Sequence, residues 1–216
     1  MVNILLLAFS TLFLPQVETP ANEKYYDLTA EEFFALPETQ QTIDHQKLDK
    51  ELLEAAVFFA SNEARDDKRK SIFSHSPILQ QSARFHSDYL LNLGTLNHLN
   101  NKDKKYKTPM MRIDAFGGNF NTSAENLARL AVIDFGEDQS YLIDKRGVFL
   151  DKNNKPVPMH TYASLARKVV DGWMHSKGHR QNLMGDYNFL GCGVSSIVKI
   201  TDGVPEIYFT QNFGKK

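Results

Sequence analysis

The chain has 216 residues, and its hydrophobic share of 42% and charged share of 24% suit one domain with a substantial core plus an extension, rather than a disordered protein. Its 25 basic and 26 acidic residues give a net charge of −1, which excludes a global basic field that would attract nucleic acid or anionic lipid. The single cysteine, Cys192, excludes an internal disulfide, and its apolar surroundings predict a buried small side chain.

The first residues have the pattern of a signal peptide. The apolar run Ile4–Leu14 has the length of a signal-peptide core and is too short to cross a membrane as a helix. Thr19-Pro20-Ala21 supplies small residues for cleavage after Ala21, although no Lys or Arg precedes the apolar run. An uncleaved anchor and a buried strand are the alternatives. We expect residues 1–21 to be a signal peptide, the mature chain to lack a transmembrane helix, and the protein to be secreted or periplasmic.

Residues 22–47 are polar and irregular, and we expect them to form an N-terminal extension lying on the domain. Within this extension, Thr29 and Glu32 have the spacing of a capping box, which predicts one short helix.

Three amphipathic helices follow in chain order. Apolar residues recur at helical spacing over 48–65. A second helix is predicted to begin at Ser76-Pro77, where a capping serine precedes a proline suited to the first turn, and to end at Gly94. A third is predicted over about 161–174, with Trp173 on its apolar, core-facing side.

The remaining regular elements have the two-residue period of strands. Residues 141–144 and 148–151 flank Lys145-Arg146-Gly147, which predicts a small hairpin inside an insertion, 139–159, that has no assigned role. Residues 191–200 and 204–213 flank Asp202-Gly203, a strong tight-turn signal. Helices followed by antiparallel hairpins indicate an α+β layered domain over 48–216.

Several short motifs occur in a fixed order between residues 48 and 213. They are Asn62-Glu63-Ala64-Arg65, Ala83-Arg84-Phe85-His86-Ser87-Asp88, His98, Ala124-Glu125-Asn126-Leu127-Ala128, the stretch 169–183 that contains Trp173 and His179, Leu190-Gly191-Cys192-Gly193-Val194, and Phe209-Thr210-Gln211-Asn212-Phe213. In order and spacing they resemble bacterial members of the CAP superfamily, which comprises cysteine-rich secretory proteins, antigen 5 and pathogenesis-related proteins and is defined by the SCP domain. Each motif alone is weak evidence, whereas this ordered set is specific.

The resemblance implies a three-layer α-β-α sandwich with a central antiparallel sheet. It also implies a cleft lined by two histidines and two acidic residues, which in relatives holds zinc or another divalent ion. The histidines correspond to His98 and His179, and the first acidic residue corresponds to Glu125. The second acidic position is Ser176 here, so this chain lacks half of the acidic pair.

The chemistry of this set suggests a weak metal site. Two imidazoles, from His98 and His179, and one carboxylate leave an open position for water on zinc, and such a site binds metal weakly and in a pH-dependent way. Glu125 is the candidate catalytic residue, because it could accept a proton from metal-bound water. The competing interpretation is a capping box, Thr122-Ser123-Ala124-Glu125, in which the carboxylate only bonds a backbone amide.

Two further residues near His179 have candidate roles. His175 lies four residues before His179, but Gly178 is expected to break the helix, so His175 is interpreted as an accessory residue of the cleft. Ser176 lies in the cleft by its family position. A nucleophilic role is disfavoured because no Gly-x-Ser-x-Gly elbow surrounds it.

The sequence therefore favours an exported ligand-binding module over an enzyme. Its ligand is expected to be a small molecule, lipid, peptide or cell-wall material, and not nucleic acid. Two alternatives stay open. One is a metal-dependent peptide or ester hydrolase that uses His98, His179 and Glu125. The other is a non-catalytic structural or interaction protein.

Overall fold

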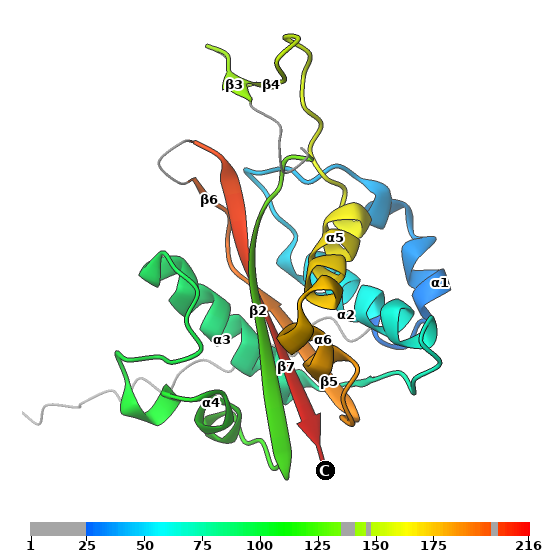
Figure 1. The fold of residues 1–216 in the computed structure, drawn as a ribbon, viewed down its shortest axis with the longest axis vertical. Coiled ribbons are helices and arrows are strands. Elements are labelled where there is room, and N and C mark those ends of the chain that lie inside the picture. Colours follow the sequence, from blue (N-terminus) through cyan, green and yellow to red (C-terminus); the bar gives the residue numbers. More distant parts are fainter. Residues whose placement is uncertain (1–24, 135–140, 146–147, 200–202) are drawn as a thin grey trace, which may run out of the picture.

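The computed structural model describes residues 25–134, 141–145, 148–199 and 203–216, and these build a three-layer α-β-α sandwich (Figure 1). Helices α3 (Pro77–Leu93) and α4 (Pro109–Ala115) cover one face of the sheet, and α2 (Lys50–Asp66) and α5 (Tyr162–His175) cover the other. The fold class predicted from the sequence is confirmed. The shorter helical elements are α1 (Ala30–Phe34), η2 (Pro37–Gln40), η3 (Lys104–Tyr106) and α6 (Lys177–Leu183).

The central sheet has the strand order β1-β5-β7-β2, with β6 paired to β7. Its strands are β1 (Ser74–His75), β2 (Thr122–Ala131), β5 (Phe189–Val194), β6 (Val198–Lys199) and β7 (Pro205–Lys215). β7 pairs antiparallel with β2, β5 and β6, and only the short β1 pairs in parallel with β5. β2 forms one edge of the sheet, between the two helical layers (Figure 1).

The outer side of β2 receives two side chains from the α5–α6 layer. The Trp173 indole nitrogen donates to the Leu127 carbonyl at 3.0 Å, and the Asn182 amide donates to the Glu125 carbonyl at 3.2 Å. Trp173 is 2% exposed, as expected for a core residue, and its polar nitrogen is satisfied by the strand edge. These two bonds fix α5 and α6 against the strand that carries Glu125.

The three long helices begin and end close to the predicted positions because their caps are present. Ser76 accepts from the Leu79 amide before α3, and Gly94 closes that helix in the left-handed conformation with φ of 76°. Thr161 caps α5 by accepting from the Ser164 amide. The capping box of Thr29 and Glu32 is also confirmed at α1.

The N-terminal extension contributes to the main core rather than only covering it. Phe33 is fully buried, and Tyr25, Phe34 and Ile43 belong to the same buried cluster as α2, α5 and the sheet. The Tyr26 ring stacks on His75 with centroids 3.4 Å apart. The predicted signal peptide, residues 1–21, lies outside the described residues.

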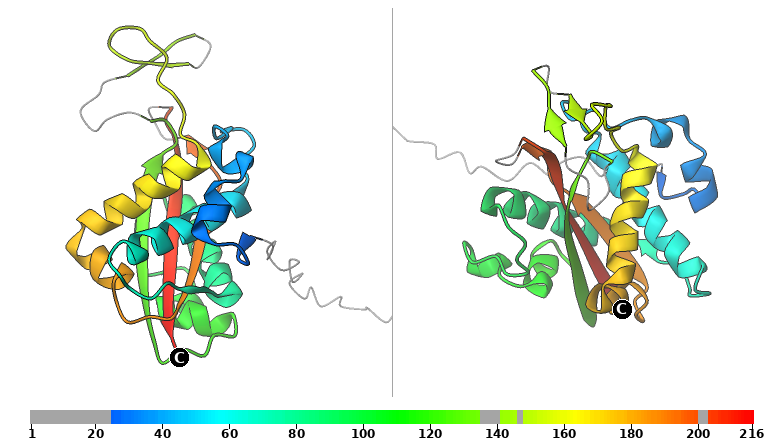
Figure 2. Two further views of the ribbon diagram at one scale, coloured as in Figure 1. Left: turned by 90° about the vertical axis from the view of Figure 1, so that its right-hand side faces the viewer. Right: turned by 45° about the horizontal axis from the view of Figure 1, so that its top comes forward.

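The insertion forms the predicted small hairpin, with β3 (Leu142–Ile143) antiparallel to β4 (Phe149–Leu150), and it projects from one end of the sandwich (Figure 2). Residue 202 of the expected Asp202-Gly203 turn lies outside the described residues, whereas Gly203 has a positive φ of 77°. Cys192 is 1% exposed, as expected for a buried small side chain. Across the described ranges, no helix combines the length and apolar character needed to cross a membrane.

Two glycines of β5 allow α3 to lie directly on the sheet. A Cβ atom added at Gly191 would lie 2.1 Å from the Gln80 backbone nitrogen, and one added at Gly193 would lie 2.2 Å from the Arg84 backbone nitrogen. The Ser87 hydroxyl spans the same contact and donates to the Gly193 carbonyl at 3.0 Å. Helix α3 is thereby held at a fixed height above the strands.

Candidate functional site

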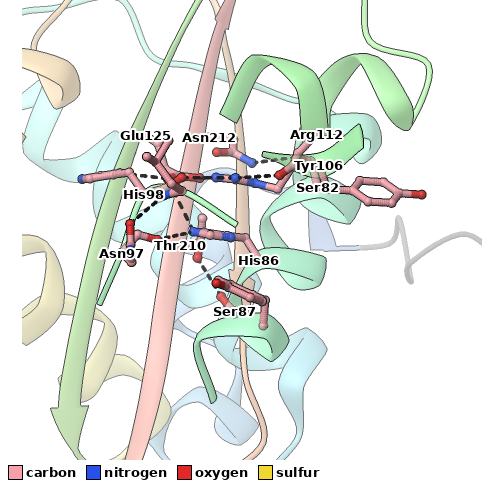
Figure 3. Close-up of polar contacts among 12 residues, drawn as sticks. Ser82, His86, Ser87, Asn97, His98, Tyr106, Arg112, Glu125, Thr210 and Asn212 are labelled. Atoms are coloured by element: carbon pink, nitrogen blue, oxygen red, sulfur yellow. Dashed lines mark hydrogen bonds and ion pairs between the residues drawn. The ribbon is translucent and has the colours of Figure 1, made fainter. Parts of the chain in front are cut away.

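Glu125 is a buried strand residue rather than a helix cap. The capping-box interpretation of Thr122 and Glu125 is wrong, because residues 122–131 pair with β7 and form β2. The Glu125 side chain is 1% exposed, and both of its oxygens are engaged. His98 Nδ1 lies 2.8 Å from Oε1, and the Arg112 guanidinium donates to Oε2 at 2.5 Å (Figure 3). A buried carboxylate is thus balanced by a buried cation.

His98 lies in the loop after α3 and joins this buried acid to solvent. Its side chain is 54% exposed, although its Nδ1 atom contacts an almost fully buried carboxylate. Because Nδ1 is bonded to Glu125, the ring is oriented, and Nε2 is the nitrogen left for a ligand.

Arg112, on α4, organises the loop that carries His98. The Arg112 side chain is fully buried, and its Nη1 atom donates to the carbonyls of His98, Tyr106 and Lys107 at 3.2, 3.2 and 3.3 Å. Its Nη2 atom bonds Glu125 (Figure 3). One guanidinium therefore fixes three backbone carbonyls of the loop and the acid of the site.

His86 and Asn212 lie next to the buried carboxylate of Glu125. His86 is fully buried on α3, with Nε2 2.9 Å from the Asn97 carbonyl and 3.8 Å from Glu125 Oε1. Its Nδ1 atom has no hydrogen-bond partner within the described part of the chain. Asn212 satisfies its neighbours when its amide nitrogen faces Glu125 Oε2 at 3.2 Å and its oxygen accepts from the Ala83 amide.

The environment of His86 keeps its ring neutral. Burial, with a smaller contribution from the positive charge of Arg112, lowers the pKa of His86 to about 4 against the opposing effect of Glu125. A neutral ring with its proton on Nε2 can donate to the Asn97 carbonyl. This histidine is therefore a structural support of the site at neutral pH.

We expect His86 to make stability depend on pH. Its folded pKa of about 4 lies below the ordinary value of 6.5, so the unfolded chain binds more protons between these values. The free energy of unfolding should then fall as the pH drops, by about 2–3 kcal/mol over this window. Urea denaturation at several pH values measures the loss, and His86→Gln should flatten the curve over the same window. A variant as pH-dependent as the native chain would contradict this assignment.

His179 approaches the same site from the opposite helical layer. It lies on α6, which is held against β2 by bonds from Asn126 to the His179 carbonyl at 3.1 Å and from Asn182 to Asn126 at 2.9 Å. Burial lowers the pKa of His179, and the positive charge of His98 lowers it further. The two imidazoles are therefore close enough to interact electrostatically across the edge of the sheet.

The remaining predicted site residues are placed differently. His175 is exposed and lies 3.3 Å from Asp171, and it lines a hollow of about 630 Å³ between α2 and α5 that His98, Glu125 and His179 do not line. Ser176 is half-buried and separates α5 from α6. The helix therefore breaks at Ser176, whereas Gly178, the predicted breaker, lies inside α6. His175 and His179 do not share a continuous helix.

The Glu125 carboxylate is buried and bonded at both of its oxygens. Oε1 faces His98 Nδ1 and Oε2 accepts from Arg112, so each oxygen of this carboxylate already has a hydrogen-bond partner. Within the ranges that the structure describes, no group of three or more His, Cys, Asp or Glu side chains is arranged to hold a metal ion. The ligating atoms available at this site are the imidazole nitrogens of His98 and His179.

The site includes three residues that sequence reasoning did not select, namely Arg112, His86 and Asn212. His86 and Asn212 occur within the quoted motifs but were given no role in the site. The helix start at Thr108-Pro109 was a usable signal for α4, since Thr108 caps it by accepting from the Met111 amide. The burial of Arg112 depends on contacts with Glu125 and the loop, which local patterns do not reveal.

Comparison with known proteins gives one family and several solved structures of similar fold, two of which have a TM-score of 0.50. A family model described as the cysteine-rich secretory protein family, CAP, matches residues 58–213. An extracellular protein containing an SCP domain from Bacillus anthracis str. Ames is similar, with a TM-score of 0.50, 19% identity, and coverage of 77% of this chain and 41% of that one. The present chain thus spans about two fifths of that protein.

The second structure is an outer surface protein from Borrelia burgdorferi. Its TM-score is 0.50 and its identity 20%, and the match covers 82% of this chain and 98% of that one. No curated protein sequence matches this chain. At these identities the solved structures establish the fold, whereas the family model establishes the family.

Proposed function

The chain belongs to the cysteine-rich secretory protein (CAP) family, and we propose that it is an exported module that binds its ligand through His98 and His179 at the edge of the sheet. The observation that carries this proposal is the half-exposed imidazole of His98, which is oriented by a buried carboxylate 2.8 Å away. A polar ring that is held in one orientation at the surface is preorganised, which lowers the entropic cost of binding a ligand.

Export is supported by two independent observations. The apolar run Ile4–Leu14 has signal-peptide character. The similar proteins of Bacillus anthracis and Borrelia burgdorferi are described as extracellular and as an outer surface protein. N-terminal sequencing of the protein recovered from cells tests this part of the proposal, and an intact Met1-Val2 start in soluble protein would contradict it.

The two imidazoles fit a weakly bound divalent metal, with zinc the preferred ion for neutral histidine nitrogens. His98 would ligate through Nε2 and His179 through a ring nitrogen, while Glu125 would orient His98 rather than ligate. When bound, the metal would supply a Lewis-acidic position open to a ligand oxygen or to water. Ser176 contributes no charge where a second carboxylate would strengthen binding.

A zinc titration followed by calorimetry tests this site. We expect weak binding that decreases as the pH falls, because protonated imidazoles do not ligate. His98→Ala or His179→Ala should abolish measurable binding, and Glu125→Gln should weaken it by about tenfold to a hundredfold. His45→Ala, at an exposed histidine of the N-terminal extension, is the matched control and should bind like the native chain. Binding that survives both site substitutions would refute the metal proposal.

A further inference from the structure

The segment 96–111, which carries His98, has a charge opposite to that of the rest of the chain. It contains four lysines and one acidic residue, Asp103, so its net charge is +3, and the remaining residues carry −1 − 3 = −4. All four lysines are exposed, at positions 102, 104, 105 and 107. The near-neutral total charge therefore conceals a local basic surface.

These lysines are free to interact with a partner. None of the four forms an ion pair with a carboxylate in the described part of the chain. The one acidic side chain among them, Asp103, accepts from the Lys105 backbone amide at 2.8 Å and caps η3. The Lys105 ammonium also lies 5.1 Å from the centre of the Tyr106 ring, a cation–π contact that brings no negative charge to the segment.

The same segment exposes large apolar side chains. Of the six large hydrophobic residues that are exposed among the described residues, three belong to it, and they are Leu96 at 44%, Leu99 at 39% and Met111 at 39%. Apolar side chains interspersed with lysines are characteristic of surfaces that lie at the boundary between lipid headgroups and acyl chains.

The segment is also held in one shape. The carbonyls of His98, Tyr106 and Lys107 converge on Arg112 Nη1, which brings the two halves of the segment together. The Tyr106 ring packs on Phe85 with centroids 4.5 Å apart, and the Asn100 amide donates to the Lys107 carbonyl at 2.9 Å. Because the backbone is fixed, the segment loses little conformational entropy when it docks.

From these observations we infer that the segment 96–111 docks the protein on an anionic lipid bilayer. Lysines are attracted to the negative headgroups, and Leu96, Leu99 and Met111 enter the headgroup layer. A soluble polyanion would satisfy the lysines but would leave the three apolar side chains in water. Since His98 belongs to the segment, docking brings the proposed site to the membrane surface, although the inference itself does not require metal binding.

Vesicle co-sedimentation with the full chain tests this inference. The measured quantity is the ratio of binding to phosphatidylcholine vesicles that contain phosphatidylglycerol over binding to phosphatidylcholine alone. The apolar run Ile4–Leu14 is present in all variants and contributes to binding on both kinds of vesicle, so its contribution cancels in this ratio. We expect a ratio well above one that decreases with salt. Lys104→Glu/Lys105→Glu should lower the ratio by at least about twentyfold, since each lysine near an anionic surface strengthens binding about fivefold.

Matched variants distinguish an effect specific to segment 96–111 from a general effect of changing charge or polarity on the protein surface. Lys47→Glu/Lys152→Glu changes the same charge at exposed positions elsewhere and should leave the ratio unchanged. Leu96→Ser/Leu99→Ser should weaken binding to anionic vesicles severalfold, whereas Ile72→Ser, at a residue 60% exposed outside the segment, should not. Equal effects of test and control variants, or a ratio of one for the native chain, would overturn the inference. Loss of binding in the lysine variant but not in the leucine variant, with competition by soluble polyphosphate, would replace the membrane by a polyanion.

Discussion

Replacing Arg112 with methionine is expected to lower the free energy of unfolding by about 3–5 kcal/mol, as for other buried ion pairs that lose one partner. The guanidinium is fully buried, bonds Glu125 Oε2 at 2.5 Å and satisfies three carbonyls of the His98 loop. Without it, a buried carboxylate and these carbonyls lose a donor in a low-dielectric interior. Urea denaturation monitored through Trp173 fluorescence measures the change.

A double-mutant cycle with Glu125→Gln identifies the cause of this loss. If the unpaired carboxylate dominates, Arg112→Met/Glu125→Gln should be more stable than the sum of the single changes predicts, by about 1–3 kcal/mol. Additive effects would instead mean that Arg112 acts mainly through the loop carbonyls. A fully native stability of Arg112→Met would contradict the role assigned to this residue.

Gly193→Ala is expected to cost about 3–5 kcal/mol, which is more than overpacking usually costs, because the backbone of α3 must move rather than a side chain. The added Cβ would lie 2.2 Å from the Arg84 nitrogen and 2.3 Å from the Ala83 carbonyl carbon, both in the backbone of α3. Displacing α3 would also break the bond from Ser87 to the Gly193 carbonyl. Thermal and urea unfolding of the variant measure this cost.

The matched control for this substitution is Gly172→Ala. Gly172 lies in α5, and an added Cβ there meets no atom within 4 Å. Alanine favours the helix over glycine, so this variant should be unchanged or stabilised by up to about 1 kcal/mol. Similar losses in both variants would show that the close approach of β5 and α3 is not the cause.

The sequence was sufficient for elements whose determinants are local. The α3 helix could be bounded because Ser76-Pro77 and Gly94 are caps that act within one turn. The same local rule misassigned Thr122 and Glu125, since their spacing also fits a helix start. These residues form a strand instead because they pair with β7. In this pairing Thr122 lies opposite Lys215, which is about 90 positions later in the chain. Long-range pairing overrides a four-residue pattern.

The candidate site was predicted only in part for a similar reason. His98, Glu125 and His179 were selected through a family resemblance, and the structure brings His98 to Glu125 and within electrostatic range of His179. Arg112 was not selected, because a single arginine in an amphipathic stretch is ordinarily a solvated side chain. Its burial follows from the assembly of α4, β2 and the His98 loop, which no single segment encodes.

The two side chains on the outer side of β2 restrict how this protein can recognise another chain. Trp173 and Asn182 already bond the outward carbonyls of Leu127 and Glu125. An extended peptide, or the sheet of a second molecule, therefore finds these main-chain acceptors occupied at the middle of the strand and cannot extend the sheet there by strand addition. A partner that binds at this edge therefore has to be recognised by side chains, foremost the imidazoles of His98 and His179 on either side of the edge.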